Sequence, residues 1–176
     1  MLERENEWPI GDDGLPTREA ARIILISPRR RVLLIQGHDF TKPEAKWWFT
    51  VGGGREPDED ARTAAVRECF EETGYTVAEE ALIGPVIYRD SRFYFADRTR
   101  RQREHFFIAH VPEFPISRQN WTRDERDVLD CMRWFSMEEL MELATAYRIY
   151  PRALPQLLPQ WVTKGWDGTC VKIIEE

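Results

Sequence analysis

Short apolar runs, separated by polar or glycine-containing breaks, recur along most of the chain. Runs rich in β-branched and aromatic residues predict buried strands. The first two are joined by a charged turn and predict a hairpin, as do the fourth and fifth, which flank a basic stretch. The predicted strands lie at residues 21–27, 31–36, 47–51, 85–97, 103–111 and 131–135.

A helix is predicted at residues 61–73, directly after a glycine-rich loop. Asp60 precedes it and can accept hydrogen bonds from the first free N–H groups as an N-cap. Gly74 follows it and suits the left-handed conformation that often ends a helix. The loop and the helix are therefore expected to form one local unit.

The second half of the chain contains further helical signals. Ser136 and Glu139 stand at capping-box spacing, and a proline-interrupted helix is predicted at 151–163. Strands and helices mixed in this order predict an α/β or α+β sandwich, with a mixed sheet between helices. The expected organisation is a flexible leader at 1–17, one domain at 18–145, and a helical tail at 146–176 packed on the same domain.

Composition narrows the class of protein. A chain of 176 residues with 42% hydrophobic and 32% charged residues is long enough for one well-packed domain. The net charge of −6 argues against general binding to nucleic acid or to anionic membranes. No apolar run approaches the roughly 18–20 residues that span a bilayer, and the first residues do not resemble a signal peptide. Three widely separated cysteines indicate reduced thiols in a cytoplasmic protein.

The predicted helix at 61–73 carries an unusual group of acids. At about 100° per residue, Glu68, Glu71 and Glu72 lie within roughly 60° of one another on one face. The opposite face is expected to pack against the core through Val66, Cys69, Phe70 and Thr73. The simplest interpretation of such acids is a solvated helix face.

Two features favour a metal site instead. Like charges at these spacings repel, and negative charge in the last turn is unfavourable to the helix dipole. A hard cation such as Mg²⁺, which prefers oxygen ligands, would explain the crowding. The glycines at 52–54 would allow the backbone to approach such a cation closely.

The spacing of these residues resembles a known motif. Gly53, five residues, Glu59, seven residues and then the segment 67–75 are similar to the Nudix box, GX5EX7REUXEEXGU, in which U is bulky and apolar. All seven fixed positions agree, whereas Cys69 and Tyr75 are less usual at their apolar positions, and the family often has proline where this chain has Val51. The segments "WWFTVGGG" and "RWFSMEEL" extend the resemblance over residues 18–145.

The resemblance implies a fold and an activity. Nudix hydrolases are α/β/α sandwiches that cleave a nucleoside diphosphate linked to another moiety, with Mg²⁺ or Mn²⁺ holding the pyrophosphate. By the same resemblance, the expected metal ligands are Glu68, Glu71, Glu72 and the backbone carbonyl of Gly52. Gly53 would belong to the ligand-binding loop, and Glu59 and Arg67 would be mainly structural, with Arg67 orienting the acids.

The general base is left open by the resemblance. Members of the family use either a glutamate of the box or an acid on a later strand or loop. Outside the box, the two candidates are Glu104, before "HFFIAHV", and Glu125, in "WTRDERDV". A surface carboxylate without a role in the reaction is the alternative for each.

Substrate recognition is less well defined. Arg98, Arg100, Arg101 and Arg103 lie at the predicted hairpin tip, where Arg101 and Arg103 could bind phosphate or simply be solvated. Trp47 and Trp48 are adjacent and should point to opposite faces of a strand, so that one is core and the other either stacks on a base or is buried as well.

Two other functions remain open. An isomerase of the same fold needs a reactive cysteine opposite a glutamate, and the three cysteines do not suit this. A non-catalytic nucleotide-binding regulator is the main alternative, although such domains often lack a box carboxylate that is present here. The expected partner is a small nucleotide derivative, and because many members dimerise, a homodimer is among the assemblies that the resemblance implies.

Overall fold

The computed structural model describes residues 8–39, 42–94, 99–121 and 123–176. Within this part of the chain, nine strands and four α-helices follow one another in a mixed order, with a 3-10 turn (η1, Glu79–Ala81) after the first helix. The strands are β1 (Thr17–Ile26), β2 (Arg31–Asp39), β3 (Lys42–Phe49), β4 (Val51–Gly54), β5 (Ile83–Tyr94), β6 (Thr99–His110), β7 (Leu129–Ser136), β8 (Arg148–Tyr150) and β9 (Val171–Glu175). The helices are α1 (Ala61–Thr73), α2 (Arg123–Val128), α3 (Met137–Ala146) and α4 (Leu154–Lys164).

The strands form one mixed sheet. Its main order is β8-β3-β2-β1-β6-β5-β9, with β4 paired to β1 and β7 paired to β2. The neighbours β1 and β6, β3 and β8, and β5 and β9 run parallel, and the other pairs are antiparallel. The predicted hairpin of β5 and β6 is confirmed, and its tip at 95–98, including Arg98, lies outside the described residues.

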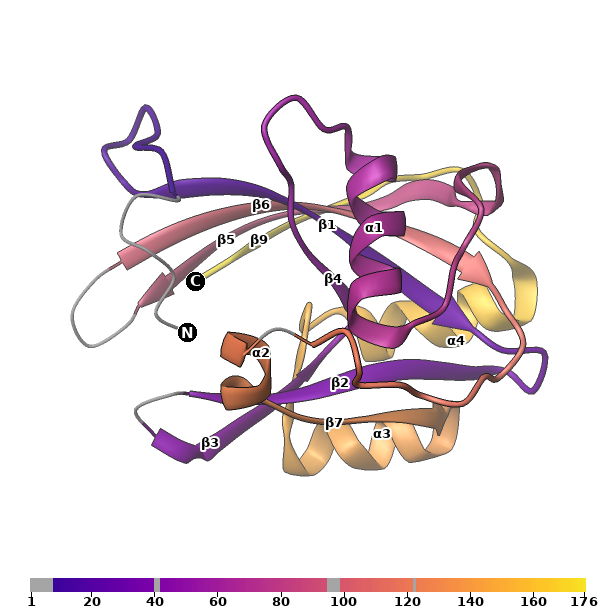
Figure 1. Cartoon of the computed structure of the whole chain (residues 1–176). Coiled ribbons are helices and arrows are strands. Elements are labelled where there is room, and N and C mark those ends of the chain that lie inside the picture. Colours follow the sequence, from indigo (N-terminus) through magenta and orange to yellow (C-terminus); the bar gives the residue numbers. More distant parts are fainter. Residues whose placement is uncertain (1–7, 40–41, 95–98, 122) are drawn as a thin grey trace.

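Strand β1 changes partner along its length, and this positions the candidate site. It meets β2 at Ile26 and Val32, whereas residues 20–23 pair with β4. The first half of β1 therefore lies between β6 and β4, and the two halves of the sheet diverge on that side (Figure 1). Helix α1 follows β4 by a short loop and packs beside this divergence (Figure 1).

Helices cover both faces of the sheet. On one face, Ala64, Ala65 and Cys69 of α1 join a core with alternate residues of β1 and β2. On the other face, Leu140 of α3 and residues of α4 pack against the remaining alternate positions. This arrangement confirms the predicted α/β/α layering, and no helix in the described part of the chain is long and apolar enough to cross a membrane.

The predicted bounds of α1 are confirmed by its caps. The Asp60 carboxylate accepts hydrogen bonds from the N–H groups of Arg62 and Thr63. Gly74 ends the helix at φ 75° and donates its N–H to the Phe70 carbonyl. Both caps are local, which explains why they could be predicted from neighbouring residues.

One prediction about the faces of α1 is wrong. Phe70, expected in the core, is 48% exposed, whereas Glu68 and Glu72 are 9% and 5% exposed. The small side chains of Ala64 and Ala65 allow the helix to approach the sheet closely, and Glu68 and Glu72 follow on the same side one and two turns later. These two acids therefore belong to the packed surface of α1.

The first and last described segments of the chain contact the sheet. Residues 8–16 turn back before β1, Trp8 is buried, and its ring contacts the guanidinium groups of Arg18 and Arg100. After the predicted tail helix, observed as α4, the chain adds β9 beside β5. Strands β8 and β9 were not predicted, so 131–135 (β7) is not the last strand.

Candidate active site

The glycine loop and α1 lie in direct contact. Gly52 has φ 134°, in the range that favours glycine, and a Cβ there would lie 2.3 Å from the Ala21 carbonyl oxygen. Its N–H donates a 2.7 Å hydrogen bond to the carboxylate of Glu72. Only glycine allows this approach to β1, so the loop backbone comes within reach of the acids on α1.

Gly53 makes room for a second carboxylate. A Cβ at this position would lie 2.5 Å from Oε2 of Glu68 and 2.7 Å from its Cδ. Because both atoms belong to a buried and hydrogen-bonded side chain, they could not move away easily. The missing side chain of Gly53 therefore accommodates the carboxylate of Glu68.

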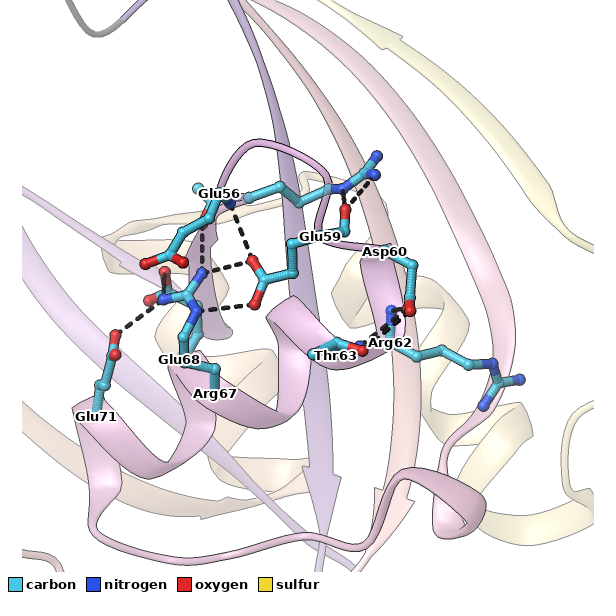
Figure 2. Close-up of polar contacts among 10 residues, drawn as sticks. Glu56, Glu59, Asp60, Arg62, Thr63, Arg67, Glu68 and Glu71 are labelled. Carbon is cyan, nitrogen blue, oxygen red and sulfur yellow. Dashed lines mark hydrogen bonds and ion pairs between the residues drawn. The ribbon is translucent and has the colours of Figure 1, made fainter.

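Arg67 connects the loop to the helix (Figure 2). Its Nε and Nη2 each donate a 2.9 Å hydrogen bond to the carboxylate of Glu59, a bidentate geometry. Nη2 also donates to the Gly54 carbonyl, and Nη1 donates to Glu68 and Glu71 at 2.9 and 3.0 Å. All five N–H donors of the guanidinium group thus have an acceptor.

The acids of α1 differ in burial and charge state. Burial raises the pKa of Glu72 well above its ordinary value, and the negative charges of Glu68 and Glu125 act in the same direction. Burial also raises the pKa of Glu68, against the lowering effect of Arg67. Glu71 is 45% exposed at its side chain and lies at the rim of the group. A cation would relieve this crowding by stabilising the ionised forms.

The residues fit a divalent cation by their chemistry. Three carboxylates and the Gly52 carbonyl supply hard oxygen donors, and the hydrogen bonds described above use one oxygen of each carboxylate. In the described part of the chain, no three acidic, histidine or cysteine side chains already converge on one point. Glu68 and Glu71 meet at Arg67, so ligation would use their second oxygens or displace part of this contact.

A loop after β6 supports the C-terminal end of α1 and leads to α2. The Trp121 indole donates a 2.7 Å hydrogen bond to the Glu72 carbonyl, and the Asn120 amide donates to the Phe70 carbonyl. These bonds satisfy carbonyl groups that a helix end leaves without partners. Glu125 follows on α2 and is close enough for its charge to act on Glu72. The structure thus places Glu125 near the acids of the box.

Glu104 has a different environment from the other predicted acids. It is fully buried on β6, and its carboxylate binds Arg22 of β1 and Arg89 of β5, each at 2.5 Å. Burial alone would raise its pKa, but the two guanidinium groups outweigh this effect and leave the pKa below its usual range. Glu104 reaches the glycine loop only indirectly, through Arg22.

The residues predicted for substrate recognition are dispersed. Trp48 is buried against Phe135, whereas Trp47 is partly exposed on the other face of β3. Arg101 and Arg103 point to the face of β6 opposite Glu104. Arg101 binds Asp13 and Asp90, and Arg103 lies near Asp90 and Glu19, so a phosphate there would compete with these acids.

Sequence reasoning missed the basic residues behind the loop. Nη1 of Arg22 donates hydrogen bonds to the carbonyl oxygens of Thr50 and Gly52, at 3.0 and 2.9 Å. The available signal was a charge next to an apolar run, at Arg22 in "AARIILIS" and at Arg89 in "VIYRDS", where Asp90 follows directly. A charge within a buried strand requires a partner, and Glu104 is the acid that meets both.

Comparison with known proteins gives related sequences. A protein of Bacillus subtilis that carries the provisional name 8-oxo-dGTP diphosphatase is 31% identical over 93 residues, which are 53% of this chain and 53% of that protein. Human diphosphoinositol polyphosphate phosphohydrolase 2 is 25% identical over 77% of this chain and 66% of its own length. The chain thus spans about half to two thirds of these relatives. The RNA pyrophosphohydrolase of Sphingopyxis alaskensis is 29% identical over 79% of this chain and 90% of that protein.

Solved structures share the fold. The dihydroneopterin triphosphate pyrophosphohydrolase of E. coli matches with a TM-score of 0.57 at 21% identity, covering 82% of this chain and 94% of that one. A NUDIX hydrolase from Nitrosomonas europaea matches with a TM-score of 0.58 at 19% identity, covering 82% and 88%. A family model described as NUDIX domain matches residues 16–157, which include the glycine loop, α1 and α2. The chain therefore belongs to the Nudix family.

Proposed function

We propose that this protein is a hydrolase, dependent on Mg²⁺ or Mn²⁺, that cleaves the pyrophosphate bond of a nucleoside diphosphate linked to another moiety. The main support is one arrangement: the Gly52 N–H holds the carboxylate of Glu72, and Arg67 holds those of Glu68 and Glu71 beside it on α1. The names of the relatives, a diphosphatase, a phosphohydrolase and a pyrophosphohydrolase, describe cleavage of phosphate anhydrides and agree with this class.

The proposed ligands of the cation are Glu68, Glu71, Glu72 and the carbonyl oxygen of Gly52. A bound divalent cation would neutralise phosphate oxygens and lower the pKa of a water molecule. Arg67 would keep the carboxylates in place while the substrate binds, because each of its donors already has a fixed acceptor. Its contact with Glu59 ties this arrangement to the start of the helix.

We assign the general base to Glu125. Its negative charge acts on Glu72, whereas Glu104 is fully buried between two arginines, and the box acids are assigned to the cation. In this assignment the Glu125 carboxylate accepts a proton from the attacking water. Such assistance contributes typically about 10²–10⁴ in rate. Trp47, the more exposed of the two adjacent tryptophans, is our candidate for stacking on a base.

The isomerase alternative has little support. Cys69 is fully buried on the core side of α1, and burial raises its pKa to about 12, so that it is a neutral thiol near neutral pH. A reactive cysteine requires the opposite environment, in which the thiolate is stabilised.

A hydrolysis screen tests the proposal against the regulator alternative. The purified protein would be incubated with Mg²⁺ or Mn²⁺ and nucleoside triphosphates, ADP-ribose, nucleotide sugars, dinucleoside polyphosphates and 5′-triphosphorylated RNA. We expect turnover of one class that EDTA abolishes and that Glu72→Gln lowers by at least about 10²-fold. Turnover that persists unchanged in Glu72→Gln would refute the ligand assignment. Saturable nucleotide binding without turnover of any substrate would instead support a regulator.

A further inference from the structure

Arg22 and Glu72 hold the two peptide groups that flank the Cα of Gly52. Arg22 lies directly opposite Gly52 in the pairing of β1 with β4. Its Nη1 donates to the Gly52 carbonyl at 2.9 Å, and the Gly52 N–H donates to Glu72 at 2.7 Å. The same Nη1 donates to the Thr50 carbonyl at 3.0 Å. The direction of the Gly52 carbonyl is thus fixed by a guanidinium group as well as by the glycine conformation.

Buried charges continue from Arg22 to the C-terminal strand. Glu104 binds Arg22 through one oxygen and Arg89 through the other, and Arg89 also binds Glu175 at 2.7 Å. We call Arg22, Glu104, Arg89 and Glu175 the charge network. Its members lie on the neighbouring strands β1, β6, β5 and β9 (Figure 1). The two arginines and two glutamates alternate, so their formal charges cancel.

The charge balance matters because Arg22 is close to the proposed ligands. Its guanidinium donates to the Gly52 carbonyl, and the N–H of Gly52 donates to Glu72, so that the charges of Arg22 and Glu72 lie close together. A carbonyl oxygen has two lone pairs, so the Gly52 oxygen can accept from Arg22 and still face a cation. An uncompensated positive charge at Arg22 would repel that cation, whereas the contact with Glu104 offsets it.

We propose that Arg22 is a positioning residue that directs the Gly52 carbonyl toward a divalent cation, and that Glu104 makes this compatible with cation binding by neutralising Arg22. The inference rests on the proposed function and reassigns Glu104 from a candidate base to a supporting charge. Both oxygens of Glu104 bind guanidinium groups, and Oε1 also accepts from Gln102 at 2.6 Å. This coordination suits a fixed charge better than a group that accepts a proton from water.

The test is a titration of Mn²⁺ into the substrate-free protein, with free Mn²⁺ measured by electron paramagnetic resonance. Glu104→Gln keeps the size of the side chain and removes its charge, whereas Arg22→Lys keeps a positive charge and removes the planar donor group. We expect each to weaken Mn²⁺ binding about 10- to 100-fold. Glu113→Gln, which changes a glutamate of the loop after β6 that is paired with Arg31, is the control and should bind as wild type.

A second readout needs no metal. Amide hydrogen exchange at Gly53, whose N–H shares a peptide group with the Gly52 carbonyl, should be faster in both single variants of the metal-free protein, because this peptide group loses its fixed direction. If Glu104→Gln does not fold, Arg22→Lys alone tests the positioning role, by Mn²⁺ titration and by amide hydrogen exchange.

Three outcomes would contradict the inference or its basis. Wild-type Mn²⁺ affinity in folded Glu104→Gln and Arg22→Lys would overturn the positioning role. Unchanged Mn²⁺ affinity with a 10²–10⁴-fold loss of kcat in Glu104→Gln would identify Glu104 as a base instead. Glu72→Gln separates the two proposals: if this variant binds Mn²⁺ as wild type, the ligand assignment itself fails, and if only this variant loses Mn²⁺, the inference alone fails.

Discussion

At the scale of single residues, the candidate site depends on side chains that are absent as much as on those that are present. Gly53 has no positive φ, so its backbone would accept an alanine. The carboxylate of Glu68, however, occupies the space that an alanine methyl group would need. The identity of Gly53 is therefore determined by its contact with an acid fifteen positions later rather than by the local turn.

This contact gives a prediction with a matched control. Gly53→Ala should push the Glu68 carboxylate from its place and lower both Mn²⁺ affinity and turnover by about 10-fold or more. Gly54→Ala should have little effect, because the nearest atom to its Cβ is the terminal nitrogen of the flexible Arg18 side chain at 3.4 Å. Mn²⁺ titration and initial rates of both variants provide the measurement. Equal effects of the two substitutions would contradict a specific role of Gly53.

At the scale of elements, local signals were sufficient for α1 and for the start of α3, but insufficient for α2, which was not predicted, and for parts of the sheet. The bounds of α1 and the capping box of α3 could be predicted because each depends on residues three or four positions apart. Strand β9 could not, since its residues alternate in exposure at the sheet edge and its pairing with β5 depends on contacts far along the chain. The exposed Phe70 was missed because the packed face of α1 is determined by β4, which no helical periodicity reveals.

The candidate site divides in the same way. The spacing of Glu68, Glu71 and Glu72 predicts that they share one face of a helix, and their positions on α1 follow from that spacing. Arg22 and Glu104 are 82 positions apart, and only the parallel pairing of β1 with β6 brings them into contact. Interactions within one helix can be predicted from the sequence, whereas buried ion pairs between strands require the strand order.

The capping box of α3 supports a prediction about stability. The Ser136 hydroxyl accepts from the Glu139 N–H at 3.1 Å, and the Glu139 carboxylate accepts from the Ser136 N–H at 2.8 Å. Ser136→Ala should lower the free energy of unfolding by about 1 kcal/mol, as for other N-caps. Thr145→Ala, at the exposed end of the same helix, should change it by less than about 0.5 kcal/mol. Urea denaturation followed by circular dichroism would measure both, and an unchanged midpoint in Ser136→Ala would disprove the contribution of the cap.

At the scale of the whole molecule, the charge network connects the C-terminal strand to the centre of the sheet. Glu175 binds Arg89 through one oxygen, and its other oxygen accepts from the Arg152 N–H before α4. Glu104 lies fully buried in the middle of these contacts. Buried ion pairs seldom stabilise a fold relative to apolar residues, but removal of one partner leaves an uncompensated charge and is costly. The cohesion of β1, β6, β5 and β9 should therefore depend on the ionisation of Glu104.

This dependence predicts how stability changes with pH. Glu104 has a folded-state pKa below the unfolded value of about 4.3, because Arg22 and Arg89 outweigh the effect of burial. Its ionised form therefore contributes stability that is fully present above about pH 4.3 and is lost as the pH falls through the lower folded-state pKa. Glu104→Gln should be less stable than wild type at pH 7, by up to about 3–5 kcal/mol, and the difference should shrink below about pH 4. Urea midpoints at pH 7, 5, 4 and 3 would show this, with the exposed Glu142→Gln as a control that follows wild type throughout. A gap between Glu104→Gln and wild type that stays constant down to pH 3 would mean that the charge of Glu104 does not hold these strands together.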